Sequence, residues 1–209
     1  MLLLVDLGET FIFLMLGFAS VLALAVGLER ALVFKRHTSK DAELFMHGLV
    51  ARLRAHDTAG AMEYSKSEAR NIYSRFAEFT MEHYQQCHDG IGDLMQGKII
   101  SEKIVLEKRL IILNTLGNNA PFIGLLGTVL GVIKAFQGLG TLGATGAEVV
   151  MRSISSALLA TAAGLFVAIP VVMANNYFSR KVKIILQNLE ILSREFLASY
   201  THGKKKSCL

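Results

Sequence analysis

Three long runs of residues without a single charged side chain constrain this chain more than any other feature. The runs cover residues 10–28, 110–133 and 153–179, and they are 19, 24 and 27 residues long. A helix needs about 20 residues to cross the hydrocarbon core of a bilayer, so each run has the length of a membrane span. We therefore expect an all-α membrane protein with three transmembrane helices, and the hydrophobic content of 52% agrees with that class.

Two other interpretations of these runs are weaker. A signal peptide begins with basic residues, whereas residues 1–10 contain Asp6 and Glu9 and neither Lys nor Arg. Buried helices of a soluble protein seldom continue for more than about 20 residues without a charge. A soluble enzyme is therefore the wrong class, and we expect no catalytic residues.

The positions of the basic residues predict the orientation in the membrane. Twelve of the 22 Lys and Arg residues lie between Lys35 and Arg109 and seven follow Ser179, whereas residues 1–9 and 137–150 contain none. Basic loops stay on the cytoplasmic side, so we expect a periplasmic N-terminus and a cytoplasmic C-terminus. The expected divisions are an external N-terminus at 1–9, a first transmembrane helix at 10–34, a cytoplasmic helical segment at 35–109, a second transmembrane helix at 110–136, an external (periplasmic) loop at 137–150, a third transmembrane helix at 151–178, and a cytoplasmic helix with a basic tail at 179–209.

The expected cytoplasmic segment has the composition of helices, because it lacks proline and is rich in Ala, Glu, Leu and Lys. We expect a break near His56–Gly60, a helix over Ala61–Cys87, a turn at Asp89–Asp93, and a helix from Leu94 that continues toward the membrane. Apolar residues at three- and four-residue spacing predict that Arg180–Tyr200 continues the third transmembrane helix as an amphipathic helix. Two transmembrane helices would then extend into a cytoplasmic helical bundle.

Histidine and cysteine spacing indicates no metal site. The histidines follow no repeated ligand spacing, and Cys87 and Cys208 lie far apart without partners at zinc spacing. We expect reduced thiols, no metal, no cofactor and no nucleic-acid partner.

The second and third runs each carry small residues on one side of a helix, because these residues recur at steps of three and four. They are Gly117, Pro121, Gly124, Thr128, Gly131 and Ala135 in the second run, with Gly127 and Gly131 forming a Gly-x-x-x-Gly pair, and Ser153, Ala157, Thr161, Gly164 and Ala168 in the third. In a membrane such faces either allow close helix packing or line a path. The simpler alternative is packing alone, with Thr128 and Thr161 bonded to carbonyls of their own helices.

Neither of these two runs contains an Asp, Glu, Lys, Arg or His. Hydroxyl groups can help to hydrate a crossing ion, but a proton carrier needs a titrating group at membrane depth. We therefore expect a partner chain to supply that group. Pro170, within the third run, leaves the carbonyl of Phe166 without a backbone donor, which predicts a helix kink.

Two motifs in these runs resemble a known family. Residues 120–131 read APFIGLLGTVLG and residues 157–170 read ALLATAAGLFVAIP. Both resemble signatures of the ExbB/TolQ/MotA family of proton-channel motor proteins, in the family's order. The three-span layout is closer to ExbB or TolQ than to MotA, which has four spans.

The resemblance implies a bacterial inner-membrane protein that forms a ring, understood as a homopentamer, in membrane lipid. The ring would surround an ExbD/TolR-like subunit whose Asp titrates, and would act indirectly on a TonB/TolA-like protein in nutrient import or envelope maintenance. Thr128 and Thr161 would line the ion pathway near that Asp. The small residues implied to pack against the partner or a neighbouring copy are Pro121, Gly124, Gly127, Gly131, Ala157, Gly164 and Ala168.

One position departs from the family's pattern. ExbB and TolQ commonly have a glutamate directly before the second motif, where this chain has Ser156. Ion transfer here would have to use water, hydroxyls or the partner, so Ser156 joins the expected ion-pathway residues. Hydroxyl oxygens also suit Na⁺, which leaves a Na⁺-coupled stator open. An oligomeric scaffold that conducts nothing is the alternative of another class.

Overall fold

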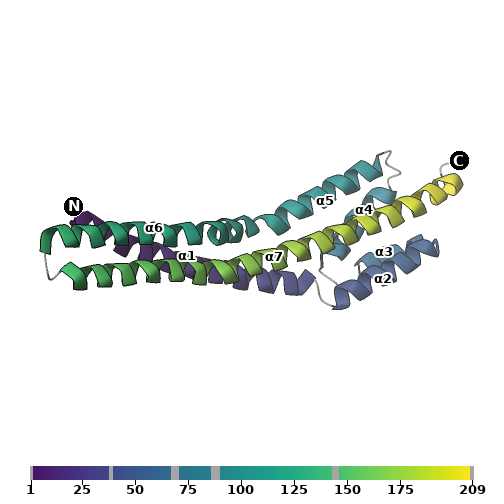
Figure 1. Cartoon of the computed structure of the whole chain (residues 1–209). Coiled ribbons are helices and arrows are strands. Elements are labelled where there is room, and N and C mark those ends of the chain that lie inside the picture. The colour runs from purple at the N-terminus through teal and green to yellow at the C-terminus, as the bar shows by residue number, and fades with distance from the viewer. Residues whose placement is uncertain (1, 38–39, 67–70, 86–89, 143–145, 208–209) are drawn as a thin grey trace. The chain divides into compact units, whose positions relative to one another are not determined.

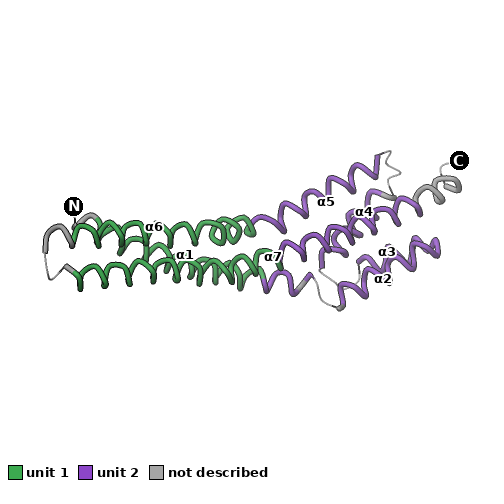
Figure 2. Tube along the Cα trace, in the orientation of Figure 1, with its two compact units in different colours: residues 1–30, 109–177 green, residues 31–108, 178–209 purple. Residues whose placement is uncertain are grey.

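The computed structural model describes residues 2–37, 40–66, 71–85, 90–142 and 146–207. These residues form seven α-helices (Figure 1). The chain divides into two compact units, Met1–Arg30 with Arg109–Tyr177 as unit 1, and Ala31–Lys108 with Phe178–Leu209 as unit 2 (Figure 2). The expected all-α class is confirmed.

The helices are α1 (Leu2–His37), α2 (Lys40–Arg54), α3 (Thr58–Lys66), α4 (Ile72–Gln85), α5 (Ile91–Glu107), α6 (Leu110–Leu142) and α7 (Gly146–Ser207).

Three of these helices are long and apolar enough to cross a membrane. The apolar segments are Val5–Lys35, Leu110–Gly138 and Ala147–Ser199, within α1, α6 and α7. The expected spans are therefore present, but the helices extend beyond them. Helix α1 already begins at Leu2, and helices occupy most of residues 137–150. A charge-free run marks the part of a helix that can lie in lipid, not the ends of the helix. The helix continues beyond that part as long as its backbone hydrogen bonds continue.

Unit 1 consists of α1, α6 and the first part of α7, with α6 antiparallel to both neighbours. Along α1, Gly8 lies against Leu130 and Glu29 pairs with Arg109. Along α7, Gly117 lies against Val172 near one end of α6, and Gly138 lies against Val149 near the other. Large apolar side chains point outward from all three helices, as lipid or neighbouring chains require. They include Phe11, Leu14, Phe18, Phe122, Phe136, Leu158, Phe166 and Met173.

Unit 2 is a helical bundle with its own apolar core. The segment of α7 beyond Phe178 buries one stripe of side chains, as its amphipathic pattern predicts. The stripe consists of Val182, Ile185, Leu189, Leu192 and Phe196. It packs on α4 and α5, since the Phe76 and Phe196 ring centroids lie 6.5 Å apart and the Ser193 hydroxyl contacts the Met95 sulfur. The expected cytoplasmic location of this bundle stays a prediction.

Some helix ends in unit 2 differ from the expected ones, because a single polar residue can determine where a helix begins. The break after α2 is confirmed: His56 has φ 59°, and Asp57 Oδ1 accepts a hydrogen bond from the Gly60 amide at the start of α3. The single helix expected over Ala61–Cys87 is wrong, because the chain bends at Asn71 before α4 begins at Ile72. Asn71 Oδ1 accepts a bond from the Ser74 amide and caps α4.

The turn expected at Asp89–Asp93 is shorter in the described residues. Gly90 has φ 91°, a left-handed conformation that glycine adopts without strain, and α5 begins at Ile91. Lys108 and Arg109 then separate α5 from α6, so the expected continuous helix is interrupted. Cys87 lies outside the described residues, as does Cys208.

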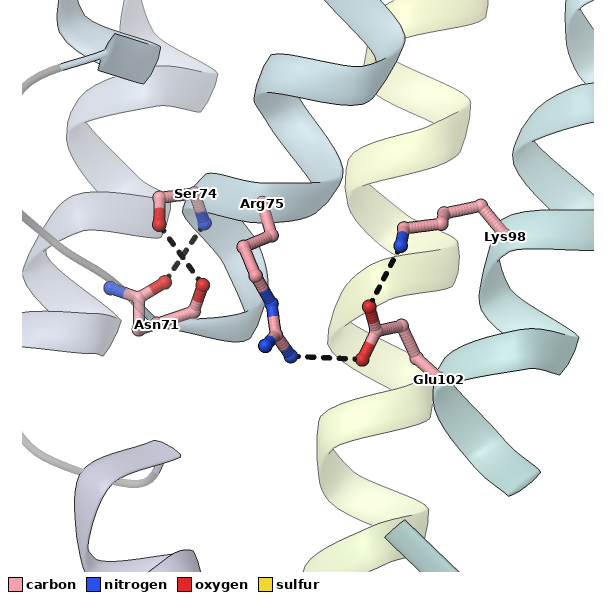
Figure 3. Close-up of polar contacts among 5 residues, drawn as sticks. All are labelled: Asn71, Ser74, Arg75, Lys98 and Glu102. Carbon is pink, nitrogen blue, oxygen red and sulfur yellow. Dashed lines mark hydrogen bonds and ion pairs between the residues drawn. The ribbon is translucent and has the colours of Figure 1, made fainter. Parts of the chain in front are cut away.

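Two polar side chains in the interior of unit 2, Glu102 and Tyr73, are paired. The Glu102 carboxylate is 7% exposed and lies between Arg75 and Lys98, each with a nitrogen 3.0 Å from one of its oxygens (Figure 3). The Tyr73 hydroxyl accepts a hydrogen bond from Asn188 of α7 at 3.0 Å. Burial raises the pKa of the Tyr73 phenol, and this hydrogen bond opposes the rise.

Candidate functional site

The two motif-bearing helices, α6 and α7, approach so closely that only glycine fits at the contact. A Cβ atom on Gly131 would lie 2.5 Å from the Cβ of Ala157, and one on Gly124 would lie 2.8 Å from the carbonyl oxygen of Ala160. On α7, a Cβ on Gly164 would lie 2.7 Å from the carbonyl oxygen of Ala120. The small faces therefore pack against each other within the chain.

The other residues expected on these faces lie nearby. Gly127 faces Ala160, with 2.5 Å between a Cβ placed on it and the alanine Cβ. Ala168 is buried and Pro121 is half-buried in a helix that continues through it. Within the chain, the small faces of α6 and α7 therefore serve close helix packing. Their contact with a partner or a neighbouring copy stays a prediction, as does the kink at Pro170, where α7 also continues.

The two threonines make different hydrogen bonds. Thr128 Oγ1 donates to the Leu125 carbonyl of its own helix at 2.6 Å, as the simpler alternative predicted. Thr161 Oγ1 instead crosses to α6 and donates to the Gly124 carbonyl at 3.2 Å. Both side chains are half-buried. The Thr161 hydroxyl thus lies at the α6–α7 contact, beside the glycines that allow it.

Ser156 belongs to a polar cluster that joins the three helices of unit 1. We use the name outer cluster for Asp6, Glu9, Lys134 and Ser156. The Ser156 hydroxyl donates to Glu9 Oε1, and Lys134 Nζ donates to Glu9 Oε2 at 3.0 Å. Lys134 Nζ also lies 2.5 Å from Asp6 Oδ1.

Sequence reasoning missed Glu9 as a member of the site, because residues 1–9 were assigned to an external N-terminus. A signal was present. Asp6 and Glu9 are three residues apart, which places them on one face of a helix, and Lys134 is the single cation between Arg109 and Arg152. Opposite charges isolated in apolar helices tend to pair.

Within the described ranges, no group of three or more His, Cys, Asp or Glu side chains is arranged to hold a metal ion. The site therefore consists of hydroxyls, backbone carbonyls, and the carboxylates and ammonium group of the outer cluster.

Comparison with known proteins identifies the family to which the chain belongs. Residues 65–191 match the model of the MotA/TolQ/ExbB proton channel family, and this range includes both motifs and most of α4 to α7. The chain belongs to the MotA/TolQ/ExbB family. The resemblance of the two motifs is thereby confirmed, and the chain falls among channel and transport proteins of the membrane.

Named relatives include both branches suggested by the motifs. The chain is 38% identical over 110 residues to the Tol-Pal system protein TolQ of Pseudomonas aeruginosa, covering 53% of this chain and 48% of that protein. It is 34% identical over 136 residues to the biopolymer transport protein ExbB of Neisseria gonorrhoeae, covering 58% and 62%. The ExbB of Aquifex aeolicus is 42% identical over 95 residues, covering 46% of this chain and 64% of that protein. The matches thus span about half to two thirds of these relatives.

Proposed function

We propose that the chain is a ring-forming stator and channel subunit of the bacterial inner membrane. Together with an ExbD/TolR-like partner, it would couple the proton-motive force to work on the outer membrane, through a TonB/TolA-like protein. The partner would contribute the titrating Asp, and the ring would be a homopentamer. The N-terminus would be periplasmic, the C-terminus cytoplasmic, and unit 2 the cytoplasmic part of the ring.

One observation carries the proposal: both family motifs lie on the antiparallel pair α6–α7, and the Thr161 hydroxyl reaches across the contact between them. The glycine contacts fix the distance between the helices, and the two threonines place hydroxyl oxygens near that contact. Hydroxyls can hydrate an ion in transit but do not change charge, so a conducting complex needs a titrating group as well.

The test is proton flux through vesicles that contain the chain and the ExbD/TolR-type protein of the same organism. Replacing Thr161 with Val keeps the shape of the side chain and removes the hydroxyl. We expect flux to fall by roughly tenfold or more, comparable to other losses of a polar group at a proton-transfer site. A pH-sensitive dye inside the vesicles reports flux after a pH step.

A matched control is Thr115→Val, because the Thr115 hydroxyl lies on α6 and donates to a carbonyl of its own helix, that of Ile111, and not across the α6–α7 contact. We expect its flux to stay near the unchanged protein's. The same assay with Na⁺ in place of the proton gradient tests a Na⁺-coupled stator. Complexes that assemble normally and pass neither ion would favour the scaffold alternative and contradict the proposal.

A further inference from the structure

Glu9 is a buried carboxylate that the proposed function has not used. Its side chain is 11% exposed, and its two oxygens bond to two different helices. Oε1 accepts from Ser156 of α7, and Oε2 accepts from Lys134 of α6 at 3.0 Å. Because Glu9 itself lies on α1, one acidic group connects the three membrane-length helices of unit 1.

The contact lies beside the small faces of α6 and α7. Ser156 directly precedes Ala157, the residue that faces Gly131. It is five residues from Thr161, a separation of about 7.5 Å along a helix. The two side chains also lie about 140° apart around the helix, so a chain of waters or hydroxyls would have to connect Glu9 with the hydroxyl that we place on the ion pathway.

The charges of the outer cluster favour the binding of a cation there. Lys134 is the single charged residue of α6, and an unpaired ammonium at this level would repel protons and metal cations. Asp6 and Glu9 both pair with it. Two carboxylates and one ammonium leave one net negative charge when all three groups are ionised. On α7 the contact is the neutral Ser156, and the nearest charged residues, Glu148 and Arg152, are exposed.

We propose that Glu9 is an ion-pathway residue: its carboxylate binds the incoming proton at the outer end of the α6–α7 contact and passes it to Ser156. The inference rests on the proposed function and adds a residue of this chain to the partner's Asp. A proton that binds Oε1 turns the oxygen from an acceptor into a donor, so the carboxyl group donates to Ser156 Oγ. The serine oxygen takes this proton while its own hydrogen leaves to the next acceptor, a water molecule or the partner's Asp. Ser156 then stays neutral and Glu9 is ionised again, and a turn of the hydroxyl back to Oε1 restores the original bond.

The first test is Glu9→Gln, which keeps the size of the side chain and a hydrogen-bond partner for Ser156 but cannot ionise. We expect flux per assembled complex to fall by roughly tenfold or more, the lower end of what a focusing charge contributes to ion capture. We also expect the dependence of flux on external pH to flatten. The matched control is Glu148→Gln, which removes an exposed carboxylate of α7 that lies outside the outer cluster, and we expect a much smaller loss.

The second test moves the carboxylate from α1 to α7. Because Ser156 contacts Glu9 directly, the double variant Glu9→Gln with Ser156→Glu places a carboxylate at the same contact. We expect it to recover most of the flux and the pH dependence lost in Glu9→Gln alone. A structural role for Glu9 predicts something else, namely a lower complex yield with unchanged flux per complex.

The two proposals fail in different ways. Normal flux and pH dependence in Glu9→Gln, together with loss of flux in Thr161→Val, would overturn the role of Glu9 and leave the proposed function standing. Loss of flux in Glu9→Gln without recovery in the double variant would overturn the need for a carboxylate at this contact, and normal flux in Ser156→Ala would overturn transfer through Ser156. If the complex of the unsubstituted chain and its partner assembles but passes no protons, both proposals are overturned.

Discussion

At the scale of single residues, the glycines of the long helices fall into two groups. Gly124, Gly131 and Gly164 lie where any Cβ atom would meet a neighbouring helix at less than 3.0 Å. Gly17 and Gly27 of α1 have no atom within 4 Å of a Cβ placed on them. The first group determines how closely α6 and α7 approach, whereas the second makes no such contact within the chain.

This difference predicts opposite effects of one substitution. Gly131→Ala should lower the free energy of unfolding by about 1–3 kcal/mol, because its Cβ would overlap that of Ala157 and force the helices apart. Gly17→Ala, in an exposed helical position, should leave stability unchanged or raise it by up to about 1 kcal/mol through helix propensity. Thermal unfolding of the chain in detergent compares the two. Equal effects would contradict the close contact.

At the scale of elements, helix α7 has two different parts, because its 62 residues contribute to both units. Its first part carries a small face, and its second part carries a stripe of large buried side chains. The spacing of these residues predicted both faces, because a helix repeats every 3.6 residues and the residue types change along it. A single helix thus packs closely against the glycines of α6 in unit 1 and against large side chains such as Phe76 in unit 2.

The second part of α7 gives a prediction of its own. Phe196 is 1% exposed and packs near Phe76, so Phe196→Ala should destabilise unit 2 by about 3–5 kcal/mol. Ile191, on the same helix and 49% exposed, provides the control, and Ile191→Ala should cost much less. Limited proteolysis of the purified chain checks this, with faster cleavage between α2 and α5 expected only in the Phe196 variant. Equal cleavage rates in the two variants would contradict the packing.

Sequence reasoning was most successful for the elements and least for contacts between them. Charge-free runs and helical spacing predicted the three long apolar helices and the buried stripe of α7. The separation of α3 from α4 depends on a cap at Asn71, and one polar residue is a weak signal beside a helix-rich composition. The bond between Glu9 and Ser156 depends on how α1 is aligned along α6 and α7. Periodicity within one helix carries no information about that alignment.

At the scale of the whole molecule, the proposed function requires one orientation in the membrane. Residues Glu148 and Lys183 lie on α7, are both exposed, and are separated by 35 residues of continuous helix. That separation corresponds to about 52 Å at 1.5 Å per residue. It exceeds the hydrocarbon thickness of about 30 Å, so one span places the two positions on opposite sides.

The orientation can be tested by labelling single cysteines in a chain that carries Cys87→Ser and Cys208→Ser. We expect a membrane-impermeant maleimide to label Glu148→Cys in intact spheroplasts, because the segment before it lacks basic residues and should lie outside. Lys183→Cys follows two basic residues, Arg180 and Lys181, and should react only after the membrane is permeabilised. The reverse pattern would contradict the orientation, and labelling of both positions in intact spheroplasts would contradict the third span. Because Glu9 of α1 contacts Ser156 near the Glu148 end of α7, the expected pattern would also place the outer cluster toward the periplasm, where protons enter.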